Sequence, residues 1–213
     1  MVAIVDGDGL ARTFRSLGAV VVNGGPGNAP AVAEILAAIE AAAAAGVLLL
    51  PNHPNVVPAA EQAVAVASKQ VAVVATRSIP GALAAATAFN PERSFEENDG
   101  AMNEGASRAR GGRLVQSTRD ADTPAGPVRR GQWLGMVEAE SVAVSDGAAE
   151  GAVAVVRSLA EPDAEVVTLV VGAGAAPDDQ GAVEESLRRS FPGLQIEVLD
   201  GGQSLFPFLI GVE

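Results

Sequence analysis

Residues 46–69 read GVLLLPNHPNVVPAAEQAVAVASK, and this stretch decides the fold. Val47–Leu50 is a short, wholly apolar run, which is typical of a strand buried on both faces of a sheet. A polar turn follows at residues 51–55, and an Ala/Val-rich helical pattern then extends to Lys69. A buried strand, a turn and a helix in this order predict one unit of an α/β fold with a parallel sheet.

The same unit recurs on both sides of this stretch. Val2–Val5, Ala19–Val22 and Val71–Ala75 are further apolar runs, and each is followed by a polar or glycine-containing turn. Between them lie a helical pattern at residues 10–17 and an alanine-rich helix from Pro30, which suits a helix because alanine has the highest helix propensity. The first ninety residues therefore predict a parallel sheet with helices on both faces.

The pattern changes after Asn90-Pro91. Residues 92–110 are polar and compatible with a helix, residues 113–144 alternate short strands with turns, and the α/β alternation resumes at Gly147. We therefore predict an α/β fold of two lobes with parallel or mixed sheets covered by helices, and a β-meander insertion in the second lobe. The predicted boundaries are 1–95 for the N-terminal lobe, 96–112 for a connecting helix and 113–213 for the C-terminal lobe.

Composition excludes several classes of site and partner. The chain has no cysteine and one histidine, so disulfides and thiolate metal sites are excluded and a zinc site is not expected. The formal net charge of −12 disfavours nucleic acid and anionic membranes, and the arginines near residues 108–113 and 129–130 are interpreted as solvated charges flanking a strand. No apolar run reaches the roughly 20 residues that span a bilayer, and no signal peptide is evident, so we expect a cytoplasmic protein without integral membrane association.

Candidate ligand-binding residues lie in the turns that follow the predicted strands, because parallel α/β sheets bind ligands beyond the carboxyl ends of their strands. The alternative is that these residues only form the turns, which need the same residue types. One internal similarity links the lobes, since residues 20–25 and 197–202 each end a strand with Asn or Asp followed by Gly-Gly. The candidate ligand- or partner-binding residues are Asp8, Gly24, Gly25, Asn52, His53, Asn55, Gly201, Gly202 and Gln203.

Known catalytic signatures are missing from these turns. The only lysine is Lys69, in a predicted helix, so no phosphate-binding loop of the Gly-Lys-Ser/Thr type exists. Asp6 and Asp8 could share a magnesium ion, but they do not form a calcium-binding loop of the helix–loop–helix type. His53 has no nucleophilic serine in a Gly-x-Ser-x-Gly turn to serve. We therefore predict no catalytic residue and no metal ligand, and leave the role of His53 open.

The same turns carry a resemblance to a known family. The sequence resembles the C-terminal part of the ATP-binding subunit of bacterial fatty acid kinase, often labelled a dihydroxyacetone-kinase-like or DAK2-domain protein. The matching segments follow one another along almost the whole chain: Gly7–Leu10, Phe14–Gly18, Gly24-Gly25 with Pro30, Leu50–Asn52 with Asn55, Ser78–Pro80, Ala88–Glu92, Gly131–Gly135 and Gly201–Phe208.

The resemblance implies a larger protein in which a separate N-terminal domain binds ATP and magnesium and transfers the phosphoryl group. It implies a DegV-like fold for this chain, no cofactor of its own, and a role in docking the separate DegV-like subunit that binds the fatty acid. The chain would then be a part of a longer kinase and would lack phosphotransferase activity alone. The family commonly has asparagine at the position of His53, which argues against the covalent histidine of true dihydroxyacetone kinases.

Two alternatives to docking remain at this point. The chain could itself bind a lipid or a carbonyl compound, using the strand-end turns and His53, or it could be a homodimerisation module. An open apolar cavity near Gly24-Gly25 or Gly201-Gly202 would favour lipid binding. A filled interior at these turns would favour docking.

Overall fold

The computed structural model describes residues 1–213, and two compact units divide the chain. The first unit is Met1–Ala109 and the second is Arg110–Glu213. The first contains β1 (Val2–Val5), α1 (Asp8–Ser16), β2 (Val20–Asn23), α2 (Val32–Ala41), β3 (Gly46–Leu50), α3 (Val57–Val66), β4 (Gln70–Val73), α4 (Ile79–Thr87) and α5 (Phe95–Arg108). The second contains β5 (Arg110–Gln116), β6 (Ala121–Thr123), β7 (Gly126–Val128), β8 (Trp133–Val137), β9 (Glu140–Ser145), α6 (Ala148–Leu159), β10 (Val166–Val171), α7 (Pro177–Ser190), β11 (Gln195–Asp200) and β12 (Phe208–Val212). The predicted α/β fold class is confirmed.

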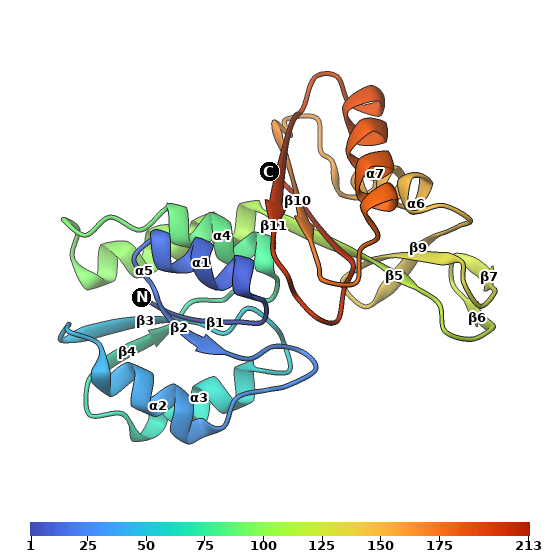
Figure 1. The fold of residues 1–213 in the computed structure, drawn as a ribbon. Coiled ribbons are helices and arrows are strands. Elements are labelled where there is room, and N and C mark those ends of the chain that lie inside the picture. Colours follow the sequence, from blue (N-terminus) through green and yellow to red (C-terminus); the bar gives the residue numbers. More distant parts are fainter. The chain divides into compact units, whose positions relative to one another are not determined.

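The sheet of the first unit has the strand order β2-β1-β3-β4, and all its strands are parallel. Successive side chains of a strand point to opposite faces, so a strand buried on both faces must be apolar throughout. Val2 and Ile4 of β1 pack in one cluster with α2 and α3, while Ala3 and Val5 are buried on the alternate positions. Figure 1 shows α2 and α3 on one side of this sheet and α1, α4 and α5 on the other.

Helix α4 is an element that the sequence pattern did not separate from its surroundings. Ser78 begins it, because its Oγ accepts a hydrogen bond from the N–H of Gly81 at 3.2 Å. The helix is buried from Pro80 to Ala86, and a Cβ on Gly105 of α5 would lie 2.8 Å from the carbonyl oxygen of Ala84. Small residues therefore let α4 and α5 approach closely. No helix of the chain combines the length and the apolar character needed to cross a membrane.

The chain passes from the first unit to the second directly after α5. The sequence predicted a connecting helix at 96–112, and the structure has α5 at Phe95–Arg108, packed against α4 within the first unit. Ser94 and Glu97 form a capping box at its start. Strand β5 begins two residues after the helix, at Arg110.

The second unit contains a mixed six-stranded sheet of order β11-β10-β12-β5-β8-β9. Strands β10 and β11 are parallel, and every other neighbouring pair is antiparallel. Strands β5, β8 and β9 form the predicted meander, and the β6–β7 hairpin lies between β5 and β8 in the chain. The last predicted strand, Leu205–Val212, is shorter in the structure because β12 begins at Phe208.

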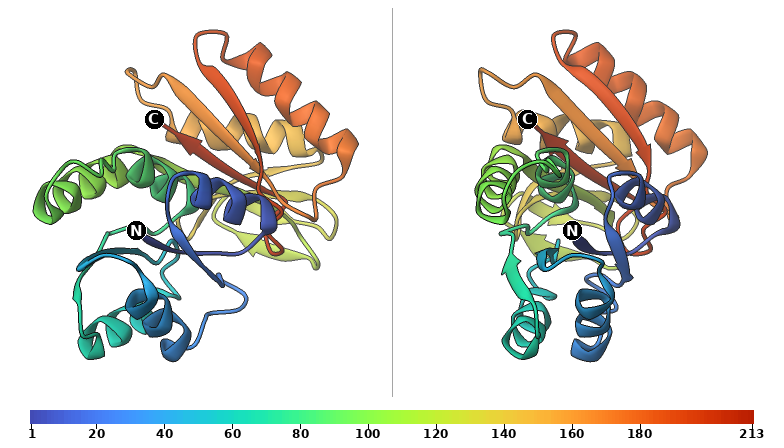
Figure 2. Two further views of the ribbon diagram at one scale, coloured as in Figure 1. Left: turned by 60° about the vertical axis from the view of Figure 1, so that its left-hand side comes forward. Right: turned by 90° about the vertical axis from the view of Figure 1, so that its left-hand side faces the viewer.

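Helices α6 and α7 pack together on one face of this sheet (Figure 2). Trp133 and Phe208 meet beneath them, with ring centroids 5.9 Å apart. Two glycines let α6 approach the sheet. A Cβ on Gly112 would lie 2.5 Å from a methyl group of Val155, and a Cβ on Gly135 would lie 2.8 Å from the other methyl.

We predict that Gly112→Ala destabilises the protein by about 1–3 kcal/mol, because a packed interior accommodates an added methyl group poorly. The backbone oxygen of Met136, 2.9 Å from that Cβ, cannot move aside as a side chain could. Urea unfolding followed by circular dichroism measures the change. Gly181→Ala in α7 is the control, since no heavy atom lies within 4 Å of its Cβ position. The control should be stabilising by up to about 1 kcal/mol, and equal effects of the two changes would contradict the packing argument.

Candidate functional site

The carboxyl ends of the parallel strands in the first unit bring most of the candidate residues to one edge of the sheet. Val5 of β1 pairs with Asn23 of β2, and Ala3 pairs with Leu50 of β3, so the turns after these strands are neighbours. The edge thus gathers the turns that hold Gly24, Gly25, Asn52, His53 and Asn55. Asp8 lies a little beyond, exposed in the first turn of α1.

Asn52 ties three of these strand ends together. Its Nδ2 donates to the carbonyl oxygen of Ile4 at 2.9 Å, and its Oδ1 accepts from the hydroxyl of Thr76 at 2.9 Å. The backbone N–H of Asn52 donates back to Thr76 Oγ1 at 3.2 Å. Both side chains are buried, with 3% and 1% exposure, and Asn52 adopts a left-handed φ of 64°. The Asn52 amide therefore connects the ends of β1, β3 and β4.

His53 and Asn55 lie on the outer side of the same turn. The Nδ1 of His53 accepts a hydrogen bond from the backbone N–H of Asn55 at 3.1 Å, and the imidazole is half-buried. An accepting Nδ1 carries no proton, so the ring proton of neutral His53 is assigned to Nε2. Asn55 is exposed, and its contribution to the turn is its backbone N–H.

The Gly24-Gly25 turn directs its N–H groups at the chain itself. Gly24 N–H donates to the carbonyl oxygen of Val5 at 3.0 Å, and Gly25 N–H donates to that of Asn28 at 3.0 Å. A Cβ on Gly24 would lie 2.6 Å from Pro30 Cδ, and one on Gly25 would lie 3.0 Å from Asp6 Cβ. Glycine is needed here for close packing, and the donors that could cradle an anion are already engaged.

The Gly201-Gly202 turn of the second unit is built in the same way. Both N–H groups donate to the carbonyl oxygen of Val171, at 2.8 and 3.0 Å. In each unit, then, the first glycine donates to the last residue of the neighbouring parallel strand, which is β1 for Gly24 and β10 for Gly201. The similarity seen in the sequence thus corresponds to a shared way of ending a parallel strand pair.

Gln203 fills the space behind the second turn. It is 4% exposed, and its Nε2 donates to the carbonyl oxygens of Val170 at 3.2 Å and Phe206 at 3.0 Å. Its Oε1 is buried without a hydrogen-bond partner and would lie 2.2 Å from a Cβ on Gly201. The side chain therefore closes the turn from inside and requires glycine at 201.

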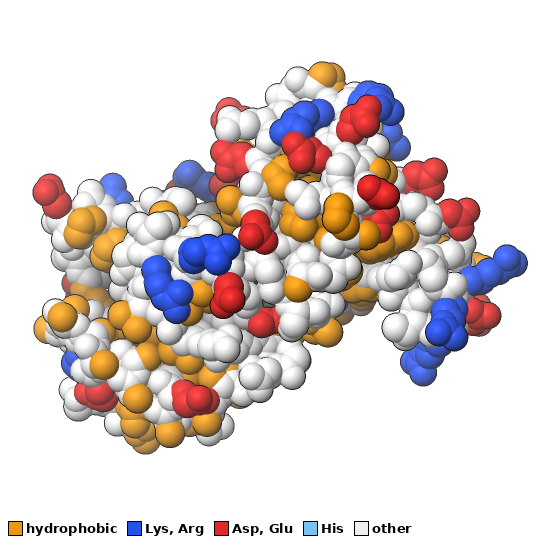
Figure 3. Space-filling model, in the orientation of Figure 1, with side chains coloured by type: hydrophobic (Ala, Val, Ile, Leu, Met, Phe, Trp, Pro, Cys, Tyr) orange, Lys and Arg blue, Asp and Glu red, His pale blue; other side chains and the backbone are white.

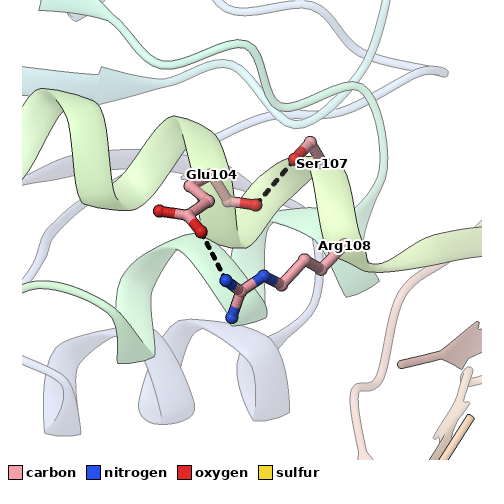
Figure 4. A network of polar contacts seen from close by, with 3 residues as sticks. All are labelled: Glu104, Ser107 and Arg108. Atoms are coloured by element: carbon pink, nitrogen blue, oxygen red, sulfur yellow. Dashed lines mark hydrogen bonds and ion pairs between the residues drawn. The ribbon is translucent and has the colours of Figure 1, made fainter. Parts of the chain in front are cut away.

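A pocket in the first unit was not anticipated by sequence reasoning. It has a volume of about 530 Å³, is open to solvent, and lies where the end of α4 meets α5. The ion pair between Glu104 and Arg108 borders it, and Ser107 Oγ donates to the carbonyl oxygen of Glu104 at 2.7 Å (Figure 4). The residues that line it are Thr87, Ala88, Phe89, Asn90, Pro91, Arg93, Ala101, Glu104, Gly105 and Arg108. The only indication in the sequence was the family-like segment Ala88–Glu92.

The loop on the rim of this pocket is rigidly held by Asn98. This side chain is 3% exposed, and its Nδ2 donates to the carbonyl oxygens of Asn90, Arg93 and Ser94 at 2.8–3.2 Å. Its Oδ1 accepts from the N–H of Asn90 at 2.8 Å. Hydrogen bonds from the backbone N–H and then the hydroxyl of Ser94 hold the pKa of Glu97 below its usual range. The loop is thus a preformed surface feature.

The fold and these turns define a class of protein first: an α/β protein of the DegV and dihydroxyacetone kinase type. The DegV family protein Cg2579 from Corynebacterium glutamicum has a TM-score of 0.69 at 17% identity, covering 99% of this chain and 95% of that chain. The dihydroxyacetone kinase from C. freundii gives 0.65 at 17% identity, over 100% of this chain and 48% of that chain. The Streptococcus pneumoniae Fatty Acid Kinase (Fak) B3 protein, loaded with linoleic acid, gives 0.60 at 14% identity, over 87% and 76%.

The family follows from the sequence match. The model of the FakA-like C-terminal family, which describes the C-terminal part of a fatty acid kinase component, matches residues 1–213, so the chain belongs to this family. Protein YloV of Bacillus subtilis (strain 168) is 28% identical over 214 residues, which cover all of this chain and 39% of YloV. The chain therefore spans well under half the length of this curated relative.

We predict that Asn52→Gly lowers the free energy of unfolding by about 1–3 kcal/mol, because it leaves the hydroxyl of Thr76 and the carbonyl of Ile4 unpaired. Asn52→Ala should cost about 1 kcal/mol more, since alanine must also adopt the left-handed φ. Urea unfolding of both variants separates the two contributions. Asn55→Ala, at an exposed position of the same turn, should change stability by less than about 0.5 kcal/mol. Indistinguishable results for all three variants would contradict the assigned role of Asn52.

Proposed function

We propose that this chain is a noncatalytic C-terminal region of a fatty-acid-kinase-type protein, and that it docks the DegV-like subunit that carries the fatty acid. The ATP and magnesium of the reaction would belong to another part of the longer protein. The family match over residues 1–213 supports this assignment, as does the presence of a DegV-like fold in both this chain and the Fak B3 protein.

One structural observation carries the noncatalytic half of the proposal. The donors at the carboxyl ends of the parallel strands point at the chain's own carbonyl groups, from Asn52 and Gly24 in the first unit and from Gly201 in the second. A ligand at this edge would have to replace these bonds, each contributing about 1 kcal/mol or more when buried. The scaffold that binds ligands in other α/β proteins is here closed by its own side chains.

The direct test is association with the cognate DegV-like protein, loaded with a long-chain fatty acid. We expect isothermal titration calorimetry to give a dissociation constant of about 10 µM or tighter, the range of specific protein–protein contacts of moderate size. An acidic protein of unrelated fold serves as the control for nonspecific heat. Absence of association at concentrations of about 100 µM, near −5.5 kcal/mol, would contradict the docking proposal.

The alternative of direct ligand binding makes a different prediction. If the strand-end turns of this chain held a lipid, or His53 formed an adduct with a carbonyl compound, the purified chain would carry additional mass. We expect mass spectrometry after denaturation to give the mass of the polypeptide alone, because Pro30, Asp6 and Gln203 fill the space at the two Gly-Gly turns. The cognate DegV-like protein purified in parallel is the positive control for acyl chains. An acyl chain or a modified His53 peptide from this chain would favour the alternative.

A further inference from the structure

The second unit carries a basic arm, defined as residues 117–132 between β5 and β8, which includes the β6–β7 hairpin. It contains Arg119, Arg129 and Arg130, and all three side chains are exposed. Figure 3 shows blue side chains projecting into solvent where Figure 1 places β6 and β7. Such a group is unexpected in a chain with a formal charge of −12.

The arginines of the basic arm differ from others in the same unit by lacking a partner. Arg110 pairs with Glu161 at 2.8 Å, Arg188 and Arg189 pair with glutamates one turn earlier in α7, and Arg113 lies 5.3 Å from the ring centroid of Phe206. No carboxylate lies within 4.0 Å of any of the three arm guanidinium groups. Three planar, permanently charged donor groups are therefore available for an anionic partner.

The nearby polar side chains hold the backbone of the arm and leave these charges uncompensated. Asp120, the carboxylate next to Arg119 in the chain, accepts a hydrogen bond from the backbone N–H of Arg130 at 2.7 Å. Gln132 Oε1 accepts from the backbone N–H of Arg129 at 2.8 Å. Both arginines are thus fixed at their Cα atoms while their guanidinium groups remain in solvent.

The base of the arm is anchored as well. Val128 of β7 is 2% exposed, and the backbone N–H of Ala125 donates to Ser141 Oγ of β9 at 3.3 Å. Ser117 Oγ donates to the carbonyl oxygen of Arg119 at 2.6 Å. A rigid backbone lowers the conformational entropy lost on binding, which is the usual advantage of a preformed contact surface.

The chemistry of the arm favours an acidic protein face over other anions. Nucleic acid and anionic membranes bind through many phosphates and a strong long-range field, and the rest of this acidic chain opposes both. The arm also contains Asp120 and Asp122, which a uniform phosphate surface would repel. A protein surface can place carboxylates opposite the three arginines and donors opposite the aspartates.

We propose that the basic arm is the electrostatic contact of this chain with an acidic patch on its DegV-like partner, an inference that rests on the proposed docking function. Exposed charges at the edge of an interface act mainly on the association rate. The arm would therefore steer the partner into register, and the effect would weaken as salt screens it.

The test is charge reversal in the complete chain, with R119E, R129E and R130E combined. We expect the association rate with the DegV-like partner, measured by surface plasmon resonance at low salt, to fall by about tenfold or more. The difference from the unmodified chain should shrink at about 0.5 M NaCl. Arg→Ser at the same three positions guards against effects of the introduced glutamates, and should lower the rate in the same direction by a smaller factor.

The matched control is the combined R188E and R189E variant, which reverses two arginines of the same unit that are already paired within α7. It should change the association rate by less than about threefold. Circular dichroism and thermal unfolding establish that each variant is folded.

The outcomes separate the two proposals. Association of the unmodified chain with an unchanged rate in both arm variants would overturn the basic arm and leave docking intact. No association of the unmodified chain would overturn both. Arm-dependent binding to phosphatidylserine vesicles or duplex DNA, or arm-dependent self-association in sedimentation, without an effect on the DegV-like partner, would also overturn the inference.

Discussion

The polar backbone groups at the carboxyl ends of parallel strands must find hydrogen-bond partners, and in this protein the chain supplies them itself. Asn52 does so for Ile4 with a buried side-chain amide, and the first glycine of each Gly-Gly turn does so for the last residue of the adjacent strand. The strand order and the turn conformations depend on these bonds. They also determine what the edge of the sheet can bind, because a donor engaged internally is not available to a ligand.

This arrangement explains how a ligand-binding type of fold can serve another purpose. The chain shares its fold with DegV family proteins and a dihydroxyacetone kinase, at identities that speak for the fold alone. Its own strand-end turns are filled by Pro30, Asp6 and Gln203. The surface features that stand out lie elsewhere: the preformed loop and pocket at the end of α4, and the rigid arm with its arginines. A scaffold with closed interior turns and rigid surface features is well suited to protein contacts.

Much of the architecture was predictable because buried strands leave a plain record in the sequence. The apolar runs at Val2–Val5 and Val166–Val171 coincide with β1 and β10, and Trp133–Val137 coincides with β8. Helix α4 was missed because its alanines and glycine show no amphipathic period when the helix is buried on all sides. The β6–β7 hairpin was missed because its strands have three residues each and contain Asp122 and Pro127 rather than an apolar alternation.

By itself, the sequence determined the α/β class, the position of the strand-end turns and the family, because these follow from apolar periodicity and local turn chemistry. Only the tertiary structure decided what the turn residues do. Asn52 lies 48 residues from Ile4 and 24 from Thr76 in the chain, and no local pattern reveals that the three strands are neighbours. Likewise, the sequence shows three arginines near a turn, but the fold decides that their neighbouring polar groups bind backbone atoms and leave the guanidinium charges exposed.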